Sequence, residues 1–363
     1  MRLRLLDRYV LSELLYPFIF GIASFSSIFI ASSMLYRITQ YMTKYGASWD
    51  SVAWLFFYSL PEVINYTFPM SMLLASLMAF GKLSGSSEII AMKSGGISYY
   101  RIVAPVLIVA FIVSMFSVVW AEKVVPASKV QYTRVLEYQI KKNTKPKTQD
   151  NVIIKIMSGD TQRLTYARRF EEESGRMMDI TIEEFDNHKL ARIQTAREGR
   201  WENGSWRLID GTVYSVHDEA GLQSTAKFDE QIIPLDIAPE QISWEQKEPE
   251  EMTIRELREY IHMLEMQDQP TARHWCEIYM RIFIPMASFF FAMIGAPLGT
   301  QKQRTSSSIG LGLSIIVIFI YYAIMTFNTG LGKGRAMNPF LACALPNIIC
   351  LMVGIYLLRQ KNA

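Results

Sequence analysis

The sequence predicts a membrane α-helical protein with six transmembrane helices and one inserted all-β domain. Half of the 363 residues are apolar, only 20% are charged and the mean hydropathy is positive, which is too apolar for an ordinary soluble protein. Six long runs without Asp, Glu, Lys or Arg fall into two groups of three. The polar stretch between the groups alternates apolar and polar residues, as strands do.

Each uncharged run is close to or above the roughly 20 residues that a helix needs to cross a bilayer. The first run is too long for the core of a signal peptide and no Ala-x-Ala-like site follows it, so we expect a retained helix. The runs cover 14–36, 63–81, 102–121, 282–301, 305–332 and 336–358. The expected domains are 1–122 with three helices, 123–250 with the β-domain, and 251–363 with a connecting helix and three more spans.

Basic residues in the short loops predict the orientation. With the N-terminus inside, ten Lys and Arg lie in cytoplasmic segments and four lie outside, and translocation of basic residues is disfavoured. Both termini are therefore expected in the cytoplasm and the central domain on the outer face, which in a Gram-negative cell is the periplasm. The net charge of +3, scattered along the chain, does not indicate nucleic acid as a partner.

The central stretch predicts a β-sandwich or jelly roll of roughly eight to ten strands. Asn203-Gly204 predicts a hairpin turn, because both turn positions need positive φ. Glycines are expected to break the chain between further strands, at Gly159, Gly175, Gly211 and Gly221. The expected strands include 152–157, 179–185, 189–196, 205–209 and 212–217.

Local signals also predict where two helices begin. Thr253 and Glu256 form a capping box before one apolar stripe, which predicts an amphipathic helix from Thr253. Pro61-Glu62 has a proline followed by an acid, which predicts the start of the second span, with 51–60 lying along the interface. The alternative for Glu62 is an intramembrane relay.

No catalytic or metal motif occurs. The Gly81-Lys82 pair lacks the upstream glycine of a P-loop, so the chain is not expected to bind ATP itself, and no cofactor is expected. The four histidines are not spaced as helical metal ligands. The cysteines, Cys276, Cys343 and Cys350, form no Cys-x-x-Cys pair, so disulfides and zinc are not expected.

The loop after the second run predicts a two-turn helix near 84–95. Serines stand at its start, Glu88 near its positive end, Lys93 near its negative end and Gly95 where a left-handed stop is wanted. One interpretation is an ordinary surface linker. The other is a coupling helix that buries Ile89, Ile90 and Met92 in a separate ATPase and pairs Glu88 with an arginine there.

Motifs along essentially the whole chain resemble the LptF/LptG permeases of lipopolysaccharide export. The order and spacing of the motifs carry this resemblance, and the start of the chain is more similar to the G-type than to the F-type. The motifs are Leu6-Asp7-Arg8-Tyr9, Phe68-Pro69-Met70, Leu74, Gly81, Ser87-Glu88, Met92, Gly95, Ile97-Ser98, Pro285, Pro339 and Leu345-Pro346-Asn347.

The resemblance implies an ABC transporter permease of the bacterial inner membrane. The implied partners are a cytoplasmic LptB-like ATPase that uses the ATP, a second LptF/LptG-type permease, LptC-like and LptA-like periplasmic jelly-roll proteins, and lipopolysaccharide itself. Glu88 is expected to touch the ATPase, with Ser87, Met92 and Lys93 shaping the same surface. Lateral entry of lipid is expected between the first span and the fifth span of the opposing permease, where Gly310, Gly312, Gly330 and Gly332 would permit close approach or serve only for packing.

Basic residues beyond the spans are candidate ligands for lipid phosphates. Arg37 and Lys44 match family positions that contact phosphates, and Arg134 is a further candidate. The alternative is that these side chains only anchor helix ends by snorkelling.

Two other functions stay open: a membrane-anchored periplasmic sensor or scaffold, and an exporter of another lipid or of lipoproteins.

Overall fold

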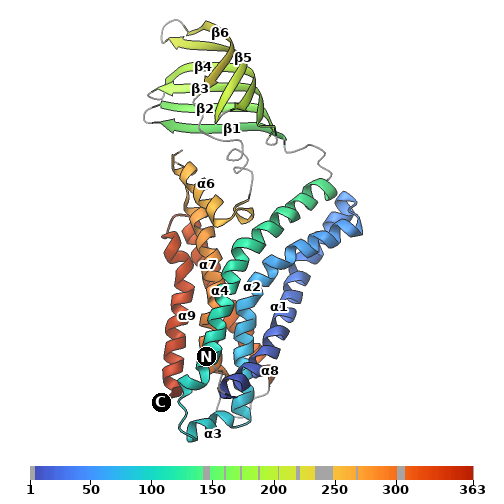
Figure 1. Ribbon diagram of the computed structural model, residues 1–363, viewed down its shortest axis with the longest axis vertical. Helices are drawn as coiled ribbons and strands as arrows, with labels where there is room; N and C mark the ends of the chain where they lie inside the picture. The colour runs from blue at the N-terminus through green and yellow to red at the C-terminus, as the bar shows by residue number, and fades with distance from the viewer. Residues whose placement is uncertain are drawn as a thin grey trace. The chain divides into compact units, whose positions relative to one another are not determined.

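The computed structural model forms two compact units. Residues Met1–Lys142 and Ala272–Ala363 make the first, and Asn143–Thr271 make the second. Figure 1 shows long helices in the first unit and a sheet in the second. The structure describes residues 5–141, 148–158, 161–171, 174–186, 189–202, 204–217, 221–233, 248–266, 269–300 and 307–362.

Among the described residues, six helices of the first unit are long and apolar enough to cross a membrane, which confirms the predicted spans. They divide three and three around the second unit, with the two-turn helix α3 (Glu88–Ser94) between the second and third. The long helices are α1 (Leu5–Tyr45), α2 (Trp49–Gly85), α4 (Tyr99–Arg134), α7 (Ala272–Gly299), α8 (Ser307–Lys333) and α9 (Pro339–Asn362). A short π-helix, η1 (Val135–Ile140), continues α4.

The predicted start of α2 at Pro61 is wrong, because the helix runs without a break from Trp49. Its first turn is capped by Ser48, whose hydroxyl accepts from the Ser51 amide at 3.3 Å. Pro61 lies inside the helix, and its carbonyl accepts a hydrogen bond of 3.0 Å from the Trp120 indole of α4. A proline inside a helix removes one backbone hydrogen bond, and membrane proteins tolerate this loss where neighbouring helices pack around it, although local sequence alone favours a helix boundary.

Helix α2 lies at the centre of the unit and packs closely on α7 through small residues. A Cβ added to Gly299 would stand 2.6 Å from the Leu77 carbonyl oxygen of α2, and one added to Gly295 would stand 2.8 Å from the Ser76 Cβ. On the opposite face of α2, Gly21 of α1 meets Ser71 in the same way. Van der Waals contact of small residues is what holds helices together in lipid, where the hydrophobic effect between them is lost.

The second unit contains one six-stranded antiparallel sheet in which each strand lies beside its sequence neighbours, in the order β1-β2-β3-β4-β5-β6. The inserted all-β domain is therefore confirmed. The described residues contain six strands in a single sheet rather than the eight to ten strands expected for a complete jelly roll. The strands are β1 (Thr148–Ser158), β2 (Thr161–Glu171), β3 (Arg176–Asp186), β4 (Lys189–Glu202), β5 (Ser205–His217) and β6 (Gly221–Ile233).

The predicted glycine breaks have different outcomes. Gly204 has φ 79° in the β4–β5 hairpin and Gly175 has φ 59° in the β2–β3 connection, as turns require. The break expected at Gly211 is wrong, because β5 continues through it. A Cβ there would stand 2.5 Å from the Thr195 carbonyl oxygen, so this glycine permits close packing rather than a turn. Gly221 opens β6, while Asn203 and Gly159 lie outside the described residues.

The capping box at the predicted helix start is present. The Thr253 amide donates to the Glu256 carboxylate at 2.7 Å and the Glu256 amide donates to the Thr253 hydroxyl at 3.3 Å. Helix α6 (Ile254–Met266) follows a single 3₁₀ turn, η2 (Pro249–Glu251). Leu257, Ile261 and Leu264 of the predicted stripe are buried.

We expect Gly299→Ala to lower the stability of the first unit, because the new methyl would press on a backbone carbonyl of α2 that has little room to move. Overpacking of this kind costs about 1–3 kcal/mol. Gly330→Ala is the matched control, since a Cβ there meets none of the residues that the structure describes within 4 Å. Thermal unfolding in detergent measures both, and an equal melting temperature for the two variants would contradict the close α2–α7 contact.

Candidate functional site

Helix α3 begins directly after α2, as a two-turn helix close to the predicted position. The C-cap residue of α2, Ser86, donates its amide to the Lys82 carbonyl, and Ser87 then takes a left-handed conformation with φ 62°. The predicted left-handed stop at Gly95 is one residue early: Gly95 has φ −78° and Gly96 has φ +81°. The Ile97 amide donates to the Met92 carbonyl at 3.1 Å, which closes the helix end.

Polar contacts fasten α3 to two membrane helices. The Tyr9 hydroxyl of α1 hydrogen-bonds the Glu88 carboxylate. The Lys93 ammonium donates to the carbonyl of Lys361, in the last turn of α9, at 3.0 Å. Ile89 is 3% exposed and belongs to the core formed with α1, α2 and α4, against which Met92 also packs. A force on α3 is therefore transmitted to the ends of at least two spans.

The outward face of α3 carries one large apolar side chain, that of Ile90, which is 60% exposed. Of the three apolar residues predicted to enter a partner, Ile89 is instead buried in the chain's own core, and Met92 is partly buried against that core. Ser87 and Lys93 are exposed, and Glu88 is partly buried beside Tyr9. Periodicity places several apolar residues on a short helix but does not determine which of them its own chain covers.

Ion pairs join the neighbouring helices at the same end of the unit. Arg101 of α4 pairs with Asp7 of α1 at 2.6 Å, and Lys82 of α2 pairs with Glu13 of α1 at 2.6 Å. The Lys361 ammonium donates to the Thr300 carbonyl just after α7. Figure 1 shows the two chain termini at this end, together with α3.

The opposite end of the unit carries a cluster of charged and aromatic side chains around Arg37, which we call the Arg37 cluster. Lys129 of α4 pairs with Glu62 of α2 at 3.2 Å, and its ammonium lies 5.8 Å from the centroid of the Tyr132 ring. Arg37 and Tyr41 of α1 lie beside the Tyr132 hydroxyl. Three helices thus bring two cations and one carboxylate together.

The electrostatics of the cluster favour binding of an anion. The adjacent Tyr132 hydroxyl raises the pKa of Arg37, so its guanidinium stays charged. Burial, with the neighbouring Tyr132, raises the pKa of Tyr41 to about 12, so this phenol stays protonated. Tyr132 is 8% exposed, and its hydroxyl has no well-aligned hydrogen-bond partner among the described residues. A phosphate oxygen would accept from such a donor and pair with both cations.

The structure separates the three predicted phosphate ligands. Arg37 lies in the cluster, whereas the Lys44 ammonium lies 5.5 Å from the centroid of the Tyr45 ring, and Arg134 is exposed on α4. Neither Lys44 nor Arg134 forms an ion pair with a described residue of the cluster. Sequence reasoning missed Lys129 and Tyr132, because a lysine three residues before a tyrosine beyond an apolar run is not a distinctive signal.

The glycines of α8 have different surroundings. A Cβ on Gly332 would stand 2.8 Å from the Ala342 Cβ and 2.9 Å from the Cys276 sulfur, so Gly332 packs within the unit. A Cβ on Gly312 or Gly330 would meet no atom of the described residues within 4 Å. The close contact of Gly310, Gly312, Gly330 and Gly332 with an opposing permease stays a prediction.

A family model described as lipopolysaccharide export system permease LptF/LptG matches residues 8–360. The chain belongs to the LptF/LptG family. It is similar to the lipopolysaccharide export system permease protein LptG of Haemophilus influenzae, with 23% identity over 237 residues. That alignment covers 63% of each chain, just under two thirds. The LptG of Escherichia coli K12 is 22% identical over 324 residues, or 84% of each chain.

The predicted likeness to the G-type subunit agrees with these relatives, both of which are LptG proteins. The family match extends over both units, from the first turn of α1 to the last turn of α9. The protein is therefore a multi-pass membrane permease with an inserted β-domain.

Proposed function

We propose that the chain is one permease subunit of an ABC transporter that extracts lipopolysaccharide from the inner membrane of a Gram-negative bacterium and passes it through the β-domain toward the outer membrane. The observation that carries this proposal is α3: a short helix fastened to α1 and α9 that still presents Ile90 outward. Anchoring a sensor would require neither six spans nor such a helix.

The orientation belongs to the same proposal. Both termini and α3 face the cytoplasm, and the second unit lies in the periplasm, because basic residues gather in the loops on the α3 side. The Arg37 cluster then stands near the periplasmic surface, where the phosphates of a lipid head group lie. Arg37 and Lys129 bind these phosphates, with Lys44 and Arg134 as outlying cations.

Power comes from a separate LptB-like ATPase, which binds ATP and grips α3. Ile90 enters its surface, while Glu88, Ser87, Met92 and Lys93 set the shape and charge of the contact. A second LptF/LptG-type permease completes the lipid cavity, and LptC-like and LptA-like proteins receive the lipid. Because α3 is tied to α1 and α9, closure of the ATPases moves the ends of both helices.

We expect Ile90→Asp to abolish recovery of the ATPase with the permease, because a charged side chain would be buried in an apolar contact. The loss should be at least about tenfold, which corresponds to roughly 1.4 kcal/mol. Ile90→Val, which keeps the contact apolar, is the matched control. Co-purification from membranes measures both variants. Retention of the ATPase by both Ile90→Asp and Glu88→Lys would contradict the coupling role of α3.

We expect the lipid content of the purified permease to fall in Arg37→Gln and Lys129→Gln and to rise in Glu62→Gln. Glu62 competes with the lipid phosphate for the Lys129 ammonium, so its neutralisation removes one competing negative charge. Each change should amount to about tenfold or more, the scale of a charge-assisted hydrogen bond of roughly 1.5 kcal/mol. Mass spectrometry of bound lipopolysaccharide measures it.

Glu13→Gln is the matched control for Glu62→Gln, because Glu13 also pairs with a lysine of a neighbouring helix but at the α3 end. It should leave the lipid content unchanged. An unchanged or lower lipid content in Glu62→Gln would contradict the competition. Recovery of a phospholipid or lipoprotein in place of lipopolysaccharide would favour export of a different cargo.

A further inference from the structure

The sheet of the second unit contains a line at which strand pairing is interrupted. In each of the five antiparallel pairings one opposed pair is missing, and these missing pairs follow one another across the sheet. The residues on the line, which we call the crease, are Asn151, Arg168, Asp179, Arg197, Asp210 and Asp229. Asp179 and Asp210 have left-handed backbones, with φ 51° and 53°.

The crease changes which residues face inward. In β2, Ala167 and Phe170 are both buried, three positions apart where regular alternation gives two, so that Arg168 and Arg169 are both exposed. In β3 the buried residues Met177 and Ile180 are likewise three positions apart, so the inward-facing pattern is shifted by one residue there too. The slip places a row of charged side chains on the outer face, in the middle of the sheet.

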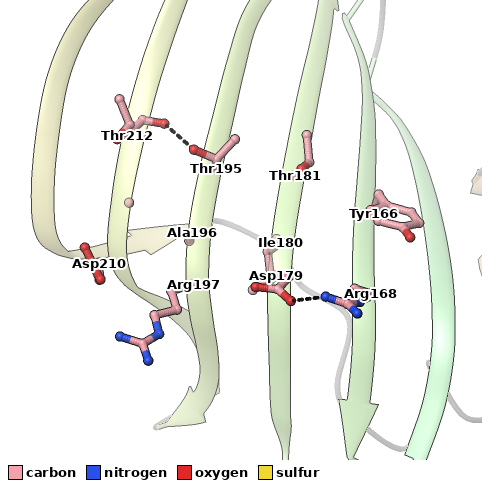
Figure 2. Close-up of a pocket in the computed structure, with 11 residues that line it drawn as sticks. Tyr166, Arg168, Asp179, Ile180, Thr181, Thr195, Ala196, Arg197, Asp210 and Thr212 are labelled. Atoms are coloured by element: carbon pink, nitrogen blue, oxygen red, sulfur yellow. Dashed lines mark hydrogen bonds and ion pairs between the residues drawn. The ribbon is translucent and has the colours of Figure 1, made fainter.

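An open groove of about 500 Å³ lies along the crease on this face. Figure 2 shows its charged side chains in one row and its hydroxyl-bearing side chains in the next. Arg168 pairs with Asp179 at 3.4 Å, and Thr195 donates to the Thr212 carbonyl at 3.5 Å. The polar side chains of the groove are Arg168, Asp179, Arg197, Asp210, Tyr166, Thr181, Thr195 and Thr212.

The lining determines what the groove can bind. The positive charges of two guanidinium groups and the negative charges of two carboxylates cancel, so the groove does not select a polyanion. Its polar surface does not suit an acyl chain. An acyl chain would match the other face of the sheet, which is apolar and carries the buried Phe170 and Leu208. A peptide strand would need a free sheet edge, whereas β2 to β5 are paired on both sides. Alternating donors and acceptors, with hydroxyls that do both, suit a ligand rich in hydroxyl groups.

We propose that the crease groove binds a saccharide. Carboxylates of Asp179 and Asp210 accept from sugar hydroxyls, Arg197 donates to them, and the Tyr166 ring provides a face for the sugar C–H groups. The volume lies within the roughly 300–1,000 Å³ of small-molecule sites. Two sources of sugar are compatible with this chemistry: the saccharide of the exported lipid, which rests on the proposed function, and a glycan of the cell wall.

The test is saturation-transfer NMR on the full-length chain in detergent, without the ATPase. The two probes are the oligosaccharide released from lipopolysaccharide by mild acid and the neutral disaccharide N,N′-diacetylchitobiose, called chitobiose below. We expect Asp210→Asn and Thr195→Val to weaken binding of the recognised probe by about fivefold each, since each removes one hydrogen-bonding function. Asparagine tolerates the left-handed backbone at position 210, so the fold is kept.

Glu202→Gln is the matched control, because Glu202 is an exposed carboxylate of the same sheet that pairs with Arg207 outside the groove. The proposal is overturned if neither probe shows saturation transfer from the protein. It is also overturned if Glu202→Gln weakens probe binding as much as Asp210→Asn and Thr195→Val do. Selective binding of the lipopolysaccharide oligosaccharide supports the groove and its link to export. Selective binding of chitobiose supports the groove and overturns that link. Because the readout involves neither ATP nor transport, failure of the Arg37 or Ile90 variants leaves this result unaffected.

Discussion

Close packing of α2 against its neighbours is the constraint on which the rest of the structure depends. In lipid there is no hydrophobic force between helices, so the first unit relies on small residues that let backbones approach, with Gly299 against the Leu77 carbonyl and Gly21 against Ser71. Helix α2 is continuous from Trp49 to Gly85. Glu62 lies toward one end of it and α3 follows the other, so one well-packed helix joins the two candidate sites.

Charge is confined largely to the two ends of the first unit, as the cost of burying it in a membrane requires. At the α3 end the charges pair between helices and stiffen the region around a small exposed surface. At the other end, no bidentate ion pair to Arg37 is present among the described residues, and the Tyr132 hydroxyl has no well-aligned hydrogen-bond partner among them. One end therefore suits transmission of force, and the other suits an anionic ligand that must also be released.

The β-domain shows why alternation alone misplaced some strand boundaries. The expected strands 179–185, 189–196 and 205–209 each begin or end beside the crease, because the inward-facing pattern slips by one residue there. In the sequence of a single strand, a one-residue shift in the alternation of buried and exposed residues looks the same as the end of the strand. Five neighbouring pairings with the same interruption show that the strands continue and bend together.

The sequence by itself determined the spans, the inserted β-domain, the capping box at Thr253, the short helix near Glu88 and the family, because each depends on local composition or spacing. Tertiary structure decided that Pro61 lies inside α2, that Ile90 rather than Ile89 faces outward, and that Lys129 and Tyr132 join Arg37. These features depend on residues far apart in the chain, from which helix and strand packing selects the exposed side chains and brings separate charges together.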